Sequence, residues 1–181
     1  WAPHLMALCD GSKNARELFA ELKRDGVLPE AAPDEEFARA IAEPFKAEDI
    51  QLVAAPAIGG IVIGHEVARA LGARFIWTER ESGEMTLRRG FTVSPGEKTL
   101  VVEDVITTGG STRETIDALK KAGADVVAAA SIIDRSGGSV DVSVPRTALA
   151  TLKVLSVDPS VCDACKLGEP AVKPGSRKAT P

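Results

Sequence analysis

The segment from Leu100 to Glu114, LVVEDVITTGGSTRE, restricts the possible folds of this chain more than any other. It opens with three apolar residues, as is typical of a strand buried on both faces, and two acidic residues, Glu103 and Asp104, follow at once. After a short loop, Ser111 and Glu114 form a capping-box pattern, which predicts that a helix begins at Ser111. The segment thus predicts a buried strand, an acidic pair, a loop of small residues and a helix in direct succession.

The loop of this segment, TTGGS at residues 107–111, suits a phosphate group. Its glycines let backbone N–H groups approach an anion closely, the helix start adds a partial positive charge, and the loop hydroxyls add donors. The two carboxylates before the loop accept hydrogen bonds from hydroxyl groups or attract Mg²⁺. A site that binds phosphate at one end and a diol at the other would suit a ribose 5-phosphate. The alternative is an ordinary strand–loop–helix joint with solvated carboxylates.

Strand and helix patterns alternate over residues 50–157, the expected core of a single domain. This alternation predicts an α/β fold, with a parallel sheet between helices, in which right-handed crossovers bring the carboxyl ends of the strands to one edge. Further strands are expected at residues 51–55, 73–78, 126–133 and 151–157, helices at 61–71 and 111–122, and a mobile excursion or short hairpin at 79–90. Because ligands of such sheets bind outside the strand ends, one pocket should be lined by the loops at residues 57–60, 103–111 and 134–138.

The two ends of the chain are expected to be peripheral, over residues 1–48 and 158–181. Helical patterns there include residues 15–24 and a second helix that Asp34 caps and Pro44 ends. No targeting pattern is visible at the start and no apolar run approaches the ~20 residues that span a bilayer, so we expect a cytoplasmic protein without membrane contact.

Composition places the chain among soluble globular proteins, with 181 residues, 44% hydrophobic residues and a mean hydropathy of +0.02. A formal net charge of −4 gives no general attraction to nucleic acid. Of three cysteines, Cys162 and Cys165 form a C-x-x-C pair. Structural zinc takes four ligands, and only Cys9 and two histidines remain, so reduced structural thiols are the expectation.

The segment at residues 100–114 resembles the phosphoribosyl-pyrophosphate (PRPP) signature of the type I phosphoribosyltransferases, in which two acidic residues precede a T-T/A-G-x-S/T loop. Further strings narrow the resemblance to the orotate phosphoribosyltransferases: APAIGG at 55–60, ERESGEMTLRRGF at 79–91, DRSGG at 134–138 and a tail at 162–177 that contains KPGSR. The resemblance implies a sheet of about five parallel strands, a small hood and a homodimer. It also implies Mg²⁺-dependent transfer of ribose 5-phosphate from PRPP to orotate, in the de novo synthesis of UMP.

The resemblance assigns roles to individual residues. Glu103 and Asp104 would hold the ribose hydroxyls and, with Arg80, form the catalytic set. The other PRPP contacts would be Ala57, Ile58 and Gly59 near the pyrophosphate, Val105 and Ile106 at the strand end, and Thr107, Thr108, Gly109, Gly110 and Ser111 at the 5′-phosphate. No residue is assigned as a metal ligand, because Mg²⁺ is expected to bind mainly through PRPP.

Thr107 and Arg135 match the orotate contacts of the family. A guanidinium group at the sheet edge also has a physical reason to bind orotate, since it can grip a planar carboxylate with two charge-assisted hydrogen bonds. The alternative for Arg135 is a surface ion pair with Asp134 or Asp141.

Two features depart from the family pattern. The segment at residues 79–90 contains no Lys or His, so Arg80 is expected to act only electrostatically, and the alternative is a solvated charged hairpin. The early L-x-S-G-x-H/K-S motif is echoed only by Leu8, Asp10, Gly11 and Lys13. A phosphoribosyltransferase for another base, or a PRPP-sensing regulator with the same fold, therefore stays an alternative.

Overall fold

The computed structural model describes residues 35–154, 157–158 and 160–168. The chain divides into two compact units, one of residues 33–153 and one of residues 1–32 with 154–181. The helix expected at residues 15–24, the cap at Asp34 and the faint early motif lie outside the described residues.

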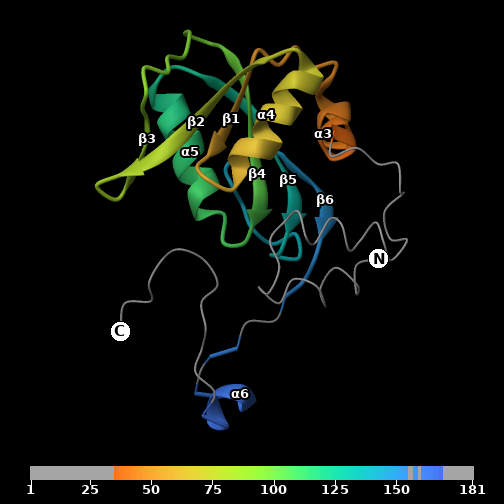
Figure 1. The fold of residues 1–181 in the computed structure, drawn as a ribbon, viewed down its shortest axis with the longest axis vertical. Coiled ribbons are helices and arrows are strands. Elements are labelled where there is room, and N and C mark those ends of the chain that lie inside the picture. Colours follow the sequence, from red (N-terminus) through yellow and green to blue (C-terminus); the bar gives the residue numbers. More distant parts are fainter. Residues whose placement is uncertain (1–34, 155–156, 159, 169–181) are drawn as a thin grey trace. The chain divides into compact units, whose positions relative to one another are not determined.

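A six-stranded sheet forms the centre of the larger unit (Figure 1). The strands are β1 (Leu52–Pro56), β2 (Arg74–Glu81), β3 (Glu84–Leu87), β4 (Lys98–Ile106), β5 (Asp125–Asp134) and β6 (Arg146–Thr151). Their order is β3-β2-β1-β4-β5-β6; five are parallel, and β3 pairs with β2 in the antiparallel direction. The predicted parallel sheet and the hairpin at residues 79–90 are therefore confirmed.

Helices cover both faces of this sheet, with α3 (Glu35–Ala42) and α4 (Gly60–Leu71) on one face and α5 (Gly110–Lys121) on the other (Figure 1). Helix α4 leads from β1 to β2, and α5 leads from β4 to β5. The chain thus leaves the neighbouring strands β1 and β4 toward opposite edges of the sheet. In open α/β sheets this reversal creates a crevice at the carboxyl ends of the two strands, where ligands bind.

The apolar run that opens the central segment explains the position of β4 in the middle of the sheet. Leu100, Val101 and Val102 have no exposed surface. Because side chains alternate along a strand, Leu100 and Val102 pack in the cluster under α3 and α4, whereas Val101 packs in the cluster under α5. Full burial of each such side chain contributes about 1.5–3 kcal/mol, so this strand anchors both layers.

Helix ends follow the glycine and proline signals. Helix α4 ends where Gly72 adopts a left-handed conformation with φ 68°, and its N–H donates to the carbonyl groups of Ala68 and Arg69. Helix α3 ends at Ala42, and Pro44 lies in the 3₁₀ turn that follows, so the α-helix stops just before the expected residue.

The expected strand at residues 151–157 is wrong, because the last strand among the described residues is β6, at Arg146–Thr151. Its alanines and threonines give a weaker apolar pattern than the residues after it. Packing decides the matter: Ala150 is buried, and Leu149 packs against the cluster under α3 and α4.

The described part of the smaller unit contains the short helix α6 (Asp163–Lys166), which includes Cys165 and directly follows Cys162. Among the described residues of the chain, no helix is both long enough and apolar enough to cross a membrane.

Candidate active site

Two carboxylates stand near the carboxyl end of β4. Glu103 is 8% exposed, and its Oε2 accepts a hydrogen bond of 3.4 Å from the Thr112 hydroxyl of α5. Burial, reinforced by the neighbouring Asp104 carboxylate, raises the pKa of Glu103 to about 8. Glu103 therefore carries a proton at neutral pH in the ligand-free protein, and it can change its charge near the pH at which enzymes work.

Asp104 meets the loop that follows β1. A Cβ added at Gly59 would lie 2.4 Å from Asp104 Oδ2, so any side chain at this position would force the carboxylate to move. The loop contains a cis peptide bond between Ala57 and Ile58, and the Ala57 N–H donates to the Thr78 carbonyl at 2.8 Å. The structure thus brings the predicted residues of this loop together with the acidic pair, at the crevice between β1 and β4.

The loop between β4 and α5 presents groups suited to an anion. Gly109 is buried and has a φ of 71°, the left-handed conformation that favours glycine, and a Cβ there would lie 2.5 Å from Val140 Cγ1. Thr107, Thr108 and Ser111 are exposed, so their hydroxyl groups are accessible. The N–H groups of the helix start lie in the same loop, and such groups are well suited to bind an anion.

The capping box predicted from Ser111 and Glu114 is wrong. Gly109 occupies the N-cap position, and no side chain caps α5. Glu114 instead forms an ion pair with Arg80, so its carboxylate binds a residue of β2 and not the start of its own helix. The backbone N–H groups at this helix start therefore receive no side-chain cap and remain available to a ligand.

Arg113 fixes this loop from its own helix. Its guanidinium group donates to the Thr108 carbonyl at 2.8 Å and to the Asp141 carbonyl at 2.6 Å. The loop between β4 and α5 is thereby tied to the segment between β5 and β6.

Asp134 shapes the loop that follows β5. Its carboxylate is fully buried and accepts hydrogen bonds from Ser136 N at 2.7 Å, Gly138 N at 3.0 Å and Arg146 at 2.7 Å. Burial alone raises its pKa, but the hydrogen bonds from Ser136 and Arg146 outweigh it and hold the pKa of Asp134 below its usual value. Asp134 is therefore an ionised structural residue that fixes the position of its neighbour, Arg135.

Arg135 is exposed at this sheet edge, and its backbone N–H donates to the Ile106 carbonyl of β4 at 2.8 Å. The ion pair with Asp134 is not formed, because Asp134 binds Arg146. Within the described part of the chain, no carboxylate pairs with the Arg135 guanidinium group, Asp141 included. The group is free to bind an anionic ligand.

Comparison with known proteins decides between the possible families. Residues 34–158, which include both loops and both carboxylates, match the family model of the phosphoribosyl transferase domain. An orotate phosphoribosyltransferase of Pelotomaculum thermopropionicum is 55% identical over 140 residues, which cover 77% of this chain and 74% of that protein. This chain belongs to the orotate phosphoribosyltransferase family. A relative of the same name from Thermotoga maritima is 54% identical over 137 residues, 76% of this chain and 73% of that protein.

Solved structures of phosphoribosyltransferases share the fold. The orotate phosphoribosyltransferase from Aeropyrum pernix has a TM-score of 0.54 at 21% identity, over 77% of this chain and 78% of that chain. The adenine phosphoribosyltransferase from Rhodothermus marinus has a TM-score of 0.54 at 26% identity, over 64% of this chain and 77% of that chain. The predicted type I phosphoribosyltransferase-like fold is confirmed, and because these names state different bases, the fold by itself does not select the base.

In this member of the orotate phosphoribosyltransferase family, Arg80 faces α5. It donates to the Gly83 carbonyl at 2.5 Å and forms an ion pair with Glu114. Arg80 lies two residues beyond Thr78, which is in register with Pro56 at the end of β1, so it stands at the correct sheet edge. In the ligand-free protein its guanidinium group is therefore engaged by neighbouring protein groups.

The other arginines of the hairpin are also paired. Arg88 lies 3.3 Å from Glu81 and 3.7 Å from Glu79, and Arg89 binds Glu79. Hydrogen bonds from Arg89 and then Trp77 hold the pKa of Glu79 below its usual value. In the ligand-free protein, the arginines of the hairpin are therefore all held in ion pairs with glutamates.

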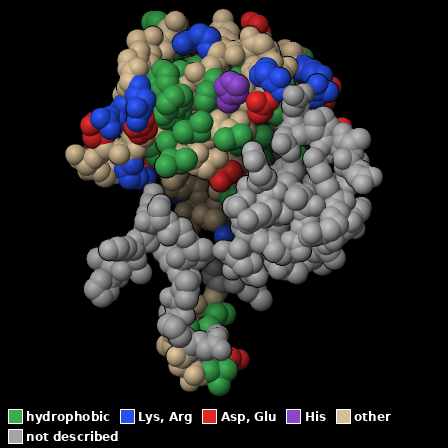
Figure 2. Space-filling view, viewed as in Figure 1, with side chains coloured by type: hydrophobic (Ala, Val, Ile, Leu, Met, Phe, Trp, Pro, Cys, Tyr) green, Lys and Arg blue, Asp and Glu red, His purple; other side chains and the backbone are tan. Residues whose placement is uncertain are grey.

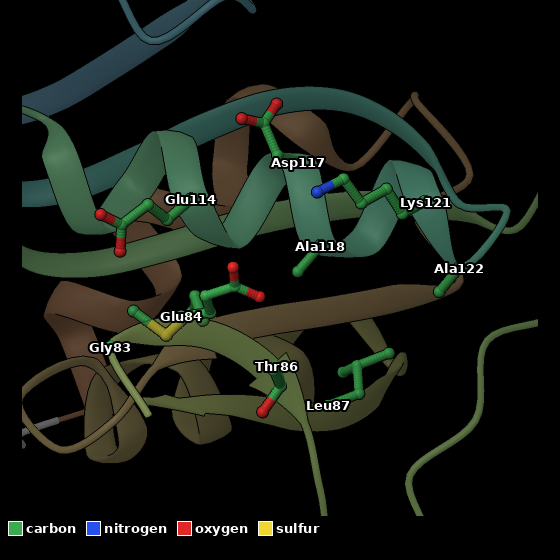
Figure 3. A pocket seen from close by; sticks show the side chains of 10 residues that line it. Gly83, Glu84, Thr86, Leu87, Glu114, Asp117, Ala118, Lys121 and Ala122 are labelled. Carbon is green, nitrogen blue, oxygen red and sulfur yellow. The ribbon is translucent and has the colours of Figure 1, made fainter. Parts of the chain in front are cut away.

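A cavity of about 540 Å³ lies between β3 and α5 (Figure 3). Glu114, Asp117 and Lys121 project from the helix, and Thr86 and Leu87 from the strand. None of the residues predicted to bind PRPP or orotate lines this cavity. We place the candidate site at the crevice instead, because the crevice collects the carboxylates and the two glycine loops.

Two polar residues beside Glu103, Thr112 and Ser131, were not singled out by any sequence pattern. Ser131 lies opposite Glu103 in the register of β4 and β5, and its fully buried hydroxyl has no hydrogen-bond partner among the described residues. The sequence shows that each lies in a helix or strand, but only the strand register places Ser131, and only the packing of α5 places Thr112, next to the carboxylate. No group of three or more His, Cys, Asp or Glu side chains within the described ranges could hold a metal ion.

Proposed function

We propose that this protein transfers ribose 5-phosphate from PRPP to orotate, giving orotidine 5′-monophosphate and pyrophosphate in the de novo synthesis of UMP. The observation that carries the proposal is the meeting of the acidic pair of β4 with the two glycine loops, through Gly59 and Asp104. The relatives described above, whose names state this activity, support orotate as the base.

The proposed PRPP pose follows from the chemistry of each loop. The 5′-phosphate binds the N–H groups and hydroxyls of residues 107–111, and the ribose hydroxyls donate to Glu103 and Asp104. The pyrophosphate lies at the loop of residues 57–59, with Arg80 as its electrostatic partner. Breaking the bond from C1 to pyrophosphate leaves a cation-like sugar, so the protein contributes mainly by holding the reactants and by stabilising charge.

Mg²⁺ fits this donor set as a companion of PRPP. The ion usually binds through one or two carboxylates, substrate phosphate oxygens and water, rather than through a cage of protein ligands. Glu103 and Asp104 are the carboxylates that the crevice offers. When bound, the ion would neutralise charge on the pyrophosphate.

Orotate is proposed to lie between Thr107 and Arg135. Both side chains are exposed at the crevice edge, and Arg135 stands next to the end of β4 through its bond to Ile106. Its unpaired guanidinium group matches the carboxylate that distinguishes orotate from uracil.

A homodimer and a cytoplasmic location belong to the same proposal. Ile58, within the proposed pyrophosphate loop, is 84% exposed, and Val62 of α4 is 76% exposed. Figure 2 shows that apolar side chains also gather next to a histidine on the face drawn there. Large apolar side chains so exposed are suited to burial against a second copy of the chain. The exposed thiol of Cys165 agrees with a reducing compartment.

The decisive experiment is the loss of orotate absorbance with PRPP and Mg²⁺, run beside the same mixture without PRPP. Arg135→Ala should raise the orotate KM strongly, and Arg135→Lys, which keeps the charge but loses the fork, should restore it only in part. Asp104→Asn should weaken PRPP turnover while the fold survives. Orotate consumption at the wild-type rate by Arg135→Ala would refute the assigned contact.

The alternative is a phosphoribosyltransferase for another base, because the fold by itself does not select the base. A panel of uracil, adenine, guanine, hypoxanthine and xanthine separates it from the first. PRPP binding without turnover of any base would point to a PRPP-sensing regulator.

A further inference from the structure

Ser131 carries a buried hydroxyl group that the proposed chemistry does not yet use. The residue is fully buried, and its Oγ has no hydrogen-bond partner among the described residues. A buried polar group without a partner lowers the stability of a folded protein, and most such groups in proteins are paired. A serine at this position therefore needs a reason other than stability.

The strand register places this hydroxyl beside Glu103. Ser131 of β5 is the Cα partner of Glu103 of β4, just as Ala129 is the partner of Val101. Val101 and Ala129 both pack in the cluster under α5. Because side chains alternate along a strand, Glu103 and Ser131 face α5 as well. Neighbouring strands lie about 4.8 Å apart, so the serine hydroxyl is within reach of the Glu103 carboxyl group.

The Glu103 carboxyl group can accept a further hydrogen bond. The Thr112 hydroxyl of α5 donates to its Oε2 at 3.4 Å. This distance is long, because hydrogen bonds between two oxygen atoms usually measure about 2.5–3.0 Å. The two oxygens of a carboxylate offer about four acceptor positions. One long bond from the helix therefore leaves room for a second donor from the strand.

We propose that Ser131 is a positioning residue for Glu103: when the ribose hydroxyls of PRPP bind, the serine hydroxyl donates to the Glu103 carboxyl group and, together with Thr112, fixes its orientation. The inference rests on the proposed function, which assigns the ribose hydroxyls to Glu103. Because the bond forms in the complex, it strengthens PRPP binding, whereas in the ligand-free protein the buried hydroxyl is only destabilising. Function and stability therefore oppose each other at this residue.

A second buried hydroxyl in the same layer provides the matched control. Thr115 of α5 is also fully buried, but its hydroxyl is bonded to the Thr78 hydroxyl of β2 at 2.9 Å. This pair is satisfied without a ligand. Thr115→Val should therefore lower the stability and leave the affinity for PRPP unchanged, which is the opposite of the pattern expected for Ser131→Ala.

The test measures PRPP binding to the full chain by calorimetry with Mg²⁺, beside urea unfolding of the same ligand-free samples. Ser131→Ala should weaken PRPP binding by about 3–30-fold, the range expected for the loss of one hydrogen bond to a carboxyl group. It should also lower kcat/KM for PRPP, leave the orotate KM unchanged and be at least as stable as wild type. In a Glu103→Ala background, Ser131→Ala should have no further effect on PRPP binding, because it acts through Glu103.

Wild-type PRPP affinity in Ser131→Ala would overturn the inference. An undiminished effect in the Glu103→Ala background would do the same, since the serine would then act on something else. Loss of stability in Ser131→Ala would mean that the hydroxyl has a structural partner in the free protein, which also contradicts the inference. A wild-type chain that does not bind PRPP would refute the proposed function and the inference together, whereas PRPP binding that is equal in wild type and Ser131→Ala refutes the inference alone.

Discussion

The Asp104 carboxylate lies directly against the backbone of Gly59, where a Cβ would come within 2.4 Å of Oδ2 and 2.8 Å of Cγ. Gly59 belongs to the loop after β1, whereas Asp104 lies within β4 near its carboxyl end, and the two strands are neighbours in the sheet. A change at either position therefore affects the other. This contact joins the proposed pyrophosphate position to the proposed ribose position.

Gly59→Ala should disturb catalysis without unfolding the protein. Gly59 has a φ of −57°, which alanine adopts easily, so the effect comes from the added Cβ displacing Asp104. A displacement of about 1 Å at a reacting centre lowers the rate by up to ~100-fold, so we expect kcat/KM for PRPP to fall by about 10–100-fold. In an Asp104→Ala background the same change should have little further effect, and a full additional loss there would show that the clash is not the cause.

The stability of the ligand-free protein should fall with rising pH because of Glu103. Its pKa is about 8 in the folded protein, against a usual value of 4.5, so the folded state holds the proton more tightly. This contribution is fully present below about pH 4.5 and is lost as the pH rises through about 8, at no more than ~1.4 kcal/mol per pH unit. Urea unfolding at about pH 6 and about pH 9 should show the decline in wild type and a smaller one in Glu103→Gln. Equal slopes in both proteins would contradict this assignment.

Arg146→Met should be strongly destabilising. It removes the charge that faces the fully buried Asp134, and an uncompensated buried carboxylate costs about 3–5 kcal/mol. Chemical denaturation measures the loss, and Asp134→Asn/Arg146→Met should recover part of it. A single variant as stable as wild type would mean that the pair contributes nothing to the loop.

Ser131→Ala should leave the ligand-free protein as stable as wild type, or more stable by about 1–3 kcal/mol, because it removes a buried hydroxyl without a partner. The matched control is Thr115→Val, which removes the buried hydroxyl bonded to Thr78 at 2.9 Å and should be destabilising. Thermal unfolding compares the two. Destabilisation by Ser131→Ala would show that the hydroxyl has a partner in solution.

Glu114→Gln should lower the KM for PRPP by a few fold, since it releases Arg80 for the pyrophosphate. Exposed ion pairs contribute about 0.2–1 kcal/mol, which limits the effect to about fivefold. Asp117→Asn, one turn further along the same helix, is the control and should change nothing. In an Arg80→Ala background Glu114→Gln should be silent, and an unchanged effect there would separate it from Arg80.

The sequence predicts those parts of the fold that a single local pattern determines. Leu100, Val101 and Val102 are apolar without interruption, so a strand buried on both faces follows from them alone. Gly72 ends α4 because a left-handed residue is needed there. The loop around Gly109 and the acidic pair before it are contiguous, so their meeting at one sheet edge follows once the sheet is parallel.

The parts that could not be predicted depend on contacts between distant segments. Ser111 and Glu114 have the spacing of a capping box, but Arg80 of a different strand takes the glutamate. Asp134 looks like a partner for Arg135, its neighbour in sequence, until β6 brings Arg146 beside it. Only the register of β4 and β5 places Ser131 beside Glu103. None of these contacts can be recognised from a periodic pattern in the sequence.

The divergence of α4 from β1 and of α5 from β4 has a consequence for how base specificity can change. The crevice between these strands is made by chain direction and by backbone groups, so it does not depend on any one side chain at its rim. Arg135 stands on that rim with no described ion-pair partner to satisfy. Because its side chain takes part in no described ion pair, Arg135 can be replaced at little cost in stability. Base specificity can therefore change at this position while the loops proposed to bind the sugar phosphate stay the same.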